Sequence, residues 1–262
     1  MASPNIYYSG VGGTTGATLA TVYPLYASGF VWYVLSTTGS DAASPRGRER
    51  IRPLATLAQA HTNAAAGDLI VCLSGHTETL AAAQTFGTAN ITVLGEGTGS
   101  AAPLFTRNAN INMFDVTAAG VHFYNLRFPV STLASALSRI RTAAASTVLD
   151  GCYLQHGAND TGPGFETITG ASQIRVRNTT FISTVTDVTT QPESAIKITN
   201  AITDLELDTV VLSGGSSGWS NTYAFNGAGA ITRLRAVNVD LLGDSDMTLA
   251  TGSTGYIVPR SQ

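Results

Sequence analysis

The chain has 262 residues, of which 44% are apolar and only 12% carry a charged side chain. This length allows one large β domain or two ordinary domains, and the charged fraction is about half of the usual share. With a net charge of −3, no strong field favours nucleic acid or an anionic membrane as a partner. The sequence has no run of 18 apolar residues, so we expect no segment that spans a bilayer.

Arginine outnumbers lysine by thirteen to one. Because arginine is favoured at interfaces and in planar ion pairs, this bias points to assembly with other chains. The two cysteines, Cys72 and Cys152, have neither a CxxC nor a metal-site spacing, and the opening "MASPNIYYSGVGG" lacks the basic and apolar regions of a signal peptide. We therefore expect free thiols in a protein that folds in a reducing cytoplasm.

Residues 1–30 form a separate N-terminal arm, with five aromatic residues and no charged side chain. Tyrosines anchor many protein interfaces, so the arm is a candidate anchor that docks on a neighbouring chain. The alternative is that it packs against the domain that follows. The tyrosines of the arm are Tyr7, Tyr8, Tyr23 and Tyr26.

The sequence pattern of residues 31–67 predicts a strand followed by a capping helix. The stretch "VWYVLSTTGSDAASPRGRERIRPLATLAQAHTNAAAGDLIVCLSGHTETL" (31–80) passes from a strand through a Gly-Ser-Asp turn and an arginine-rich loop to a short helix and a second strand. It resembles the first segment of the pectate-lyase-like β-helix family. The resemblance implies that the helix, around residues 54–66, covers the first coil and that Gly67 and Asp68 begin the first core strand. A solenoid needs such a cover, because an open end exposes unpaired strand edges.

The loop "SPRGRERIRP" (44–53) carries Arg46, Arg48, Arg50 and Arg52 around one glutamate. A site for single-stranded nucleic acid would interleave aromatic residues, which this loop lacks. We expect the loop to pair with acidic groups of a neighbouring subunit, and a solvated loop is the alternative.

Residues 68–262 contain a repeat of short strands. Its copies are "VHFYNLRF" (121–128), "STVLDGCY" (146–153), "IRVRNTTF" (174–181), "LELDTVVL" (205–212) and "LRAVNVDL" (234–241). The steps between their fifth residues are 25, 28, 31 and 29 residues, with little helical pattern between them. Such a period indicates a solenoid, and we predict an all-β, right-handed, single-stranded parallel β-helix of about seven coils.

Two positions of the repeat predict its cross-section. The fifth residues are expected at a tight corner, because asparagine tolerates a left-handed backbone. They are Asn125, Asp150, Asn178, Thr209 and Asn238. The chain turns inward after this corner, so the eighth residues should stack as one buried column. They are Phe128, Tyr153, Phe181, Leu212 and Leu241.

The same register gathers charged residues of three strands on the outer face. A step of 31 residues sets Arg175 beside Glu206, and a step of 29 sets Glu206 beside Arg235. Neighbouring strands lie about 4.8 Å apart, which is within ion-pair reach. We call this set the charge ladder and predict that it fixes the register of the coils. Its members are Arg175, Arg177, Asp204, Glu206, Asp208, Arg233 and Arg235.

A catalytic alternative uses the acids of the charge ladder. In pectate lyases, which the chain resembles in fold, clustered acids hold calcium and an arginine acts as the base, so Asp204, Glu206 and Asp208 would be the candidates. Calcium needs ligands with spare negative charge. The neighbouring arginines would neutralise these acids, so we expect no metal and no cofactor. A glycosidase-like carboxylate pair remains an alternative, whereas Asp244 and Asp246 indicate a turn.

Three further features have weaker signals. The stretch "GEGTGS" (95–100) lacks the lysine of a phosphate-binding loop and predicts a corner turn. Trp219 is the best single candidate for stacking on a sugar. The histidines lack the spacing of a metal site and are expected at the surface or the cap: His61, His76, His122 and His156.

Low charge, the arginine bias and a compact β-helix with an aromatic arm favour a structural role. Short β-helices that are rich in Ser, Thr, Gly and Ala and lack a signal peptide resemble bacteriophage virion proteins, which are commonly homotrimers. The resemblance implies a non-enzymatic capsid decoration (cement) protein, a homotrimer of the virion that is assembled in the host cytoplasm with capsid or other virion proteins as partners. The alternative is a carbohydrate-active or carbohydrate-binding β-helix of the tailspike type, a polysaccharide lyase or glycosidase. A self-assembling adhesin would need a secretion signal.

Overall fold

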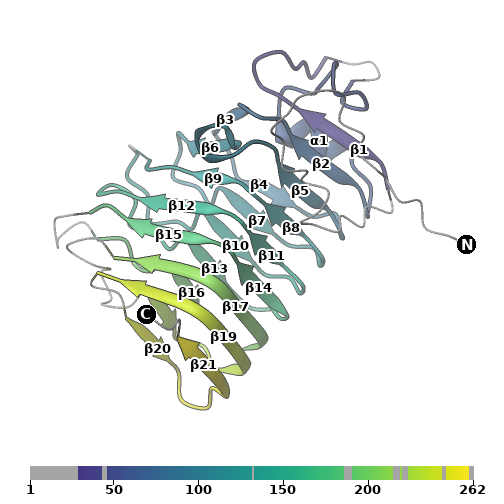
Figure 1. Ribbon diagram of the computed structural model, residues 1–262. Helices are drawn as coiled ribbons and strands as arrows, with labels where there is room; N and C mark the ends of the chain where they lie inside the picture. Colours follow the sequence, from purple (N-terminus) through teal and green to yellow (C-terminus); the bar gives the residue numbers. More distant parts are fainter. Residues whose placement is uncertain are drawn as a thin grey trace, which may run out of the picture.

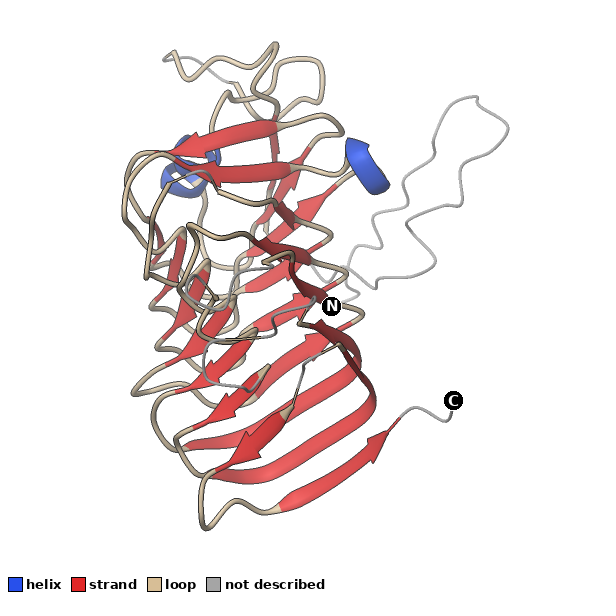
Figure 2. Cartoon of the chain, turned by 90° about the vertical axis from the view of Figure 1, so that its left-hand side faces the viewer, coloured by secondary structure: helices blue, strands red, loops and turns tan. Residues whose placement is uncertain are grey.

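The computed structural model describes residues 29–42, 46–131, 133–185, 191–214, 219, 224–243 and 246–259. The described chain is an all-β parallel solenoid of about six turns, with one α-helix beside its first strands (Figures 1 and 2). The anchor predicted at Tyr7, Tyr8, Tyr23 and Tyr26 lies outside the described residues.

The turns of the solenoid build three rows of parallel strands. The first row contains β1 (Val31–Val34), β2 (Leu69–Cys72), β5 (Thr92–Gly95), β8 (His122–Tyr124), β11 (Val148–Asp150), β14 (Ile174–Arg177) and, at the far end, β21 (Gly255–Pro259). The second row contains β3 (Thr77–Leu80), β6 (Leu104–Arg107), β9 (Arg127–Phe128), β12 (Tyr153–His156) and β15 (Thr180–Ser183). The third row contains β4 (Gln84–Phe86), β7 (Phe114–Val116), β10 (Ile140–Thr142), β13 (Phe165–Thr167), β16 (Ile196–Ile198), β18 (Phe225–Gly227) and β20 (Met247–Leu249).

Two long strands join the first and second rows. β17 (Ile202–Ser213) pairs with both β14 and β15, and β19 (Ile231–Leu242) follows β17 along its length. Within the described residues the first two rows therefore form one 14-stranded sheet, and the third row forms a separate 7-stranded sheet. The core lies between these sheets, because the strand residues that alternate inward are apolar and fully buried.

Left-handed residues form the corner between the first two rows, as the sequence predicts for four of the five coils. These residues are Asn125, Asn178, Thr209 and Asn238, with φ of 54°, 46°, 56° and 53°. In the remaining coil the prediction was wrong by one residue, because Gly151, with φ of 66°, stands at the corner instead of Asp150. Glycine enters this region without steric cost, and Asp150 is a strand residue that pairs with Tyr124 and Arg177.

The same shift corrects the predicted inward column. Leu154, rather than Tyr153, pairs with Phe128 on one side and Phe181 on the other. These three side chains are fully buried, as is Leu212 in the next coil. Leu241 continues the register but is 39% exposed. Its exposure follows from its place in the last described coil, since β21 pairs with β19 only as far as Val239.

Helix α1 (Leu57–Asn63) is shorter than the predicted span of residues 54–66. The hydroxyl of Thr56 accepts a hydrogen bond from the Gln59 amide at 3.2 Å and so begins the helix at Leu57. The backbone is already extended again at Ala64. Leu57 and Ala60 carry the apolar face of the helix into the core.

Asp68 explains the Gly-Asp step that precedes β2. Its carboxylate is buried and accepts hydrogen bonds from the Phe30 amide at 2.6 Å, the Trp32 indole at 2.9 Å and the Ala65 amide at 2.9 Å. One side chain therefore joins β1 to the segment that leads from α1 into β2.

Candidate functional site

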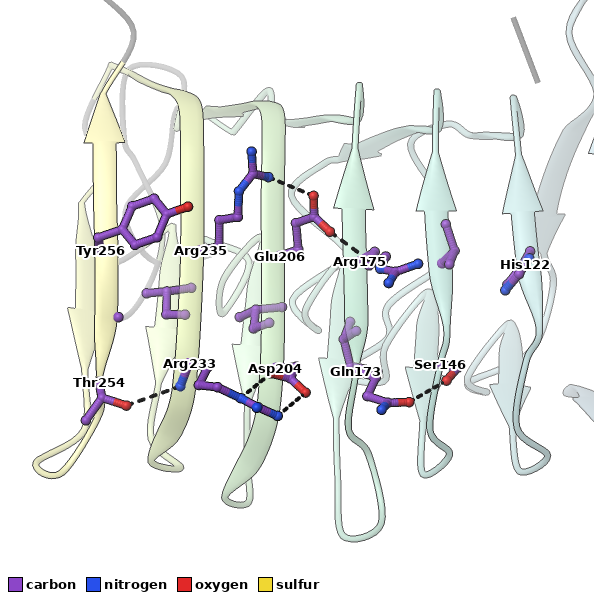
Figure 3. A pocket seen from close by; sticks show the side chains of 15 residues that line it. His122, Ser146, Gln173, Arg175, Asp204, Glu206, Arg233, Arg235, Thr254 and Tyr256 are labelled. Carbon is purple, nitrogen blue, oxygen red and sulfur yellow. Dashed lines mark hydrogen bonds and ion pairs between the residues drawn. The ribbon is translucent and has the colours of Figure 1, made fainter. Parts of the chain in front are cut away.

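An open groove of about 570 Å³ lies across the first row of strands, over β8, β11, β14, β17, β19 and β21. Figure 3 shows two lines of side chains that cross these strands. One line runs from Tyr256 through Arg235 and Glu206 to Arg175, and the other includes Arg233 and Asp204. The groove therefore contains most of the predicted charge ladder.

Glu206 stands at the centre of the charge ladder, in the predicted register. Its backbone pairs with Arg175 of β14 on one side and with Arg235 of β19 on the other. The carboxylate accepts bonds from Arg177 at 2.8 Å and from Arg235 at 2.7 Å, and it lies 3.4 Å from Arg175. Arg177 is paired by backbone with Asp208, but its guanidinium reaches Glu206 instead.

Asp204 and Arg233 form a second ion pair at the edge of the groove. Arg233 donates through both Nε and a terminal nitrogen, at 2.5 and 2.6 Å. Both residues have a left-handed backbone, and Ser146 and Gln173 have the same backbone in the preceding coils and are joined by a hydrogen bond of 2.8 Å. The sequence reading did not find this second corner, because no single residue type marks it.

The chemistry open to the groove follows from these pairs. Glu206 and Asp204 are engaged by arginines, and Asp208 lies 3.6 Å from Arg235 and accepts a bond from Thr209 at 3.1 Å. Lone pairs directed at guanidiniums are less available to bind a cation or to take up a proton. In the described part of the chain no three or more His, Cys, Asp or Glu side chains are grouped so that they could hold a metal ion.

Two groups at opposite ends of the groove have shifted pKa values. A hydrogen bond to Tyr256, together with the nearby acids Glu206 and Asp208, raises the pKa of Arg235. Burial, and then the charge of Arg175, lowers the pKa of His122. Arg235 therefore stays a cation and His122 is neutral at pH 7.

The arginine loop has partners within its own chain. Arg50 makes a bidentate ion pair with Glu96, with one contact of 2.6 Å. The guanidinium of Arg48 stacks over the ring of Phe30 at 3.5 Å from the centroid and lies 4.6 Å from that of Trp32. Arg46 is half-buried and Arg52 is exposed. Two of the four arginines predicted to bind a neighbouring subunit are thus engaged in the same chain.

A second group of charges, which the sequence reading missed, lies in the interior. We call Arg107, Arg139 and Asp160 the buried charge cluster, because all three side chains are shielded from solvent and both arginines form ion pairs with the aspartate. Arg107 also donates to the carbonyls of Ile111 and Leu137, at 2.7 and 2.9 Å. Burial lowers the pKa of Arg139 to about 10, so its guanidinium remains charged at neutral pH.

Several single-residue predictions are corrected by burial. Trp219 is only 1% exposed and packs edge-on against His156, so it cannot stack on a sugar at the surface. His156 is fully buried rather than a surface residue, and His76 is buried between Ser36 and Glu78. Both cysteines are free and buried, as expected for cysteines without a disulfide spacing.

Turns were predicted at residues 95–100 and at Asp244 and Asp246, and the outcome differs between the two. Residues 95–100 form a corner with left-handed Gly97 and Gly99, as expected. Asp244 lies outside the described residues, and Asp246 accepts a bond from the next backbone amide. No described helix has the length and apolar character needed to cross a membrane.

Comparison with protein-family models, with curated proteins and with solved structures finds no match for this chain. The fold and the groove are therefore the basis on which a function can be inferred.

Proposed function

We propose that this chain is a non-enzymatic structural protein of a bacteriophage virion, a capsid decoration or cement protein that acts as a homotrimer. The observation that carries the proposal is the state of the groove, in which the central carboxylate, Glu206, is surrounded by three arginines. A catalytic acid needs a vacant side for a proton, a metal ion or a substrate. Glu206 instead binds neighbouring coils to one another.

The composition supports the same proposal. A charged fraction of only 12%, with thirteen arginines and one lysine, is typical of a chain that buries surface in repeats or in partners. The virion, the trimer and the site of assembly in the host cytoplasm follow from the resemblance of the sequence to phage β-helices. In this proposal the arm of residues 1–30 attaches the solenoid to the capsid.

The experiment is to look for the chain in purified particles. Two phage stocks are compared: one encodes the full chain, and the other encodes the chain without residues 1–28. Both are purified on density gradients and analysed by quantitative mass spectrometry. We expect the full chain in a fixed ratio to the major capsid protein. The shortened chain should remain folded in the lysate and be lost from the particles. A full chain that is absent from the particles would overturn the proposal.

A second candidate function, carbohydrate binding, is favoured by one observation. Tyr256 is 53% exposed at the end of the groove, next to arginine and carboxylate groups that can hydrogen-bond to sugar hydroxyls. The aromatic ring offers an apolar face, and the polar groups beside it offer hydrogen bonds, so together they suit a sugar ring. If this function is right, Tyr256→Ala should lose at least tenfold in affinity for a host polysaccharide in calorimetry. Tyr33→Ala, on a strand outside the groove, is the matched control. No measurable binding by the unaltered chain would remove this candidate.

A further inference from the structure

The two ends of the solenoid differ in what covers them. At the first end, the free edge of β1 already has hydrogen-bond partners from the arginine loop. The Tyr33 amide donates to Gly47 at 2.7 Å, and the Leu35 amide donates to Leu54 at 2.8 Å. Helix α1 lies at the same end (Figure 1). Two further strands at this end, β3 and β4, pair on one side only in the described chain, but Ser36 accepts a bond from the Thr77 amide of β3, and His61 of α1 packs on Phe86 of β4.

At the other end, two strands have a neighbour on one side only. Among the described residues, β21 pairs with β19 alone and β20 pairs with β18 alone. Six of the ten large apolar side chains that are exposed in the described chain lie on the last strands: Leu241, Leu242, Leu249, Tyr256, Ile257 and Val258. We call these residues the apolar end.

The apolar end is where the stacked columns of the core stop, because no described coil follows. Val176, Leu207 and Ala236 stack in successive coils and are fully buried, and Ile257 continues this column but is 44% exposed. Tyr256 and Val258, on the opposite face of β21, are also about half exposed. Ile257 faces inward, so its exposure shows that no described coil follows it and that the open direction there lies along the solenoid axis. Exposed apolar side chains grouped on a monomer commonly mark an interaction surface.

We propose that the apolar end is a docking surface for the apolar end of a second copy of this chain, related by a two-fold axis. Around such an axis β21 meets its own copy in antiparallel orientation, so the unpaired backbone groups of two edge strands satisfy one another. The first end of another copy suits this role less well, because β1 is already bonded to its own chain and this end carries Arg50 and Arg52.

The charges of this surface fit a two-fold contact. Near a two-fold axis each side chain faces its own copy, so any charge there meets a like charge, which opposes association. The strands β20 (Met247–Leu249) and β21 (Gly255–Pro259) carry no charged side chain. Charged groups beside these strands include Arg235 of β19, which bonds to Tyr256, and Asp246, which precedes β20, but the two edge strands themselves place no charge at the contact. The same surface would also close the two core columns that end at Leu241 and Ile257.

The test measures the mass of the assembly by light scattering on the full chain. Val258 is the site of substitution, because it lies on the outer face of β21 and a lysine there does not enter the core. We expect Val258→Lys and Val258→Glu each to halve the number of copies in the assembly. For two of the proposed trimers joined at their apolar ends, this is a change from six copies to three. Mixing the two variants in equal amounts should restore the mass, because opposite charges then face one another.

Two controls distinguish other occupants of the apolar end. Ile51→Lys changes a side chain that is 87% exposed at the first end, and its mass should equal that of the unaltered chain. A chain without residues 1–28 should keep the same number of copies; if it loses the factor of two, the arm rather than the apolar end makes the contact and the proposal is wrong. The proposal also fails if Val258→Lys has the mass of the unaltered chain, or if the mixture of variants stays at half mass while circular dichroism shows both to be folded.

Discussion

The charge ladder and the buried charge cluster are built from the same groups in different surroundings. In the ladder three arginines surround Glu206, and all four side chains are between one-fifth and about half exposed. In the cluster two arginines hold Asp160, and none of the three side chains reaches solvent. Water screens the first set of charges, so each pair contributes little, whereas an unpaired charge in the second would be strongly destabilising.

The two networks also connect different parts of the solenoid. The ladder joins residues that are already paired as neighbours in β14, β17 and β19. The cluster joins strands to the segments between them, because Arg107 ends β6 and Arg139 donates to the carbonyls of Pro129 and of Gln155 in β12 as well as to Asp160. The ladder can thus be lost while the sheet keeps its register, whereas around Asp160 the described chain has only an isolated backbone bridge, to Ser135, beside the contacts of the cluster.

The largest effect is expected from Asp160→Asn. Without its carboxylate the cluster retains two buried guanidiniums and no counter-charge, and loss of one partner of a buried pair costs about 3–5 kcal/mol. The measurement is the free energy of unfolding from denaturant titration. A loss below about 1 kcal/mol would show that the three side chains are hydrated in solution and that the contrast with the ladder is wrong.

The next effect is a pH dependence of stability to which the fully buried His156 contributes. Burial, and then the charge of Arg139, holds the pKa of His156 well below its ordinary value of 6.5. The unfolded chain therefore takes up a proton below about pH 6.5 that the folded chain does not, and stability falls with decreasing pH by up to about 1.4 kcal/mol per pH unit. His156→Gln should reduce this slope between pH 6.5 and 5. Burial also lowers the pKa values of His61 and His122, so part of the slope should remain; an unchanged slope would refute the assignment to His156.

The smallest effect is expected in the ladder. Glu206→Gln removes the central carboxylate and should lower the free energy of unfolding by about 1 kcal/mol, because exposed pairs contribute little one by one. The loss should shrink further in molar salt, which screens exposed charges. Asp160→Asn, measured in the same salt, is the matched comparison and should show the same loss as at low salt. Equal salt dependence in both variants would contradict the division between them.

The ladder could be predicted from the sequence because its members repeat with the period of the coils. The steps that set Arg175 beside Glu206 and Glu206 beside Arg235 need no knowledge of the loops. The register failed only at Asp150, where the following residue, Gly151, takes the corner. That position was ambiguous because aspartate and glycine both favour turns.

The cluster could not be predicted in this way. Arg107 ends β6, Arg139 precedes β10 and Asp160 lies in the connection between β12 and β13, so no repeat relates them. Trp219 was misjudged for a related reason, since burial of a loop residue depends on how the loops pack and leaves no periodic signal. The one general hint in the sequence is that only 12% of its residues are charged. Where charges are so few, a charge that is buried is expected to have a partner.

The most direct test of a structural rather than a ligand-binding role for Glu206 is the thermal midpoint of the full chain in excess calcium and in excess chelator. Bound calcium at about 100 times its dissociation constant would stabilise the fold by about 2.7 kcal/mol. Because its arginine neighbours occupy Glu206, we predict the same midpoint in calcium and in chelator, for the unaltered chain and for Glu206→Gln alike. A midpoint that calcium raises in the unaltered chain, and leaves unchanged in Glu206→Gln, would contradict the account.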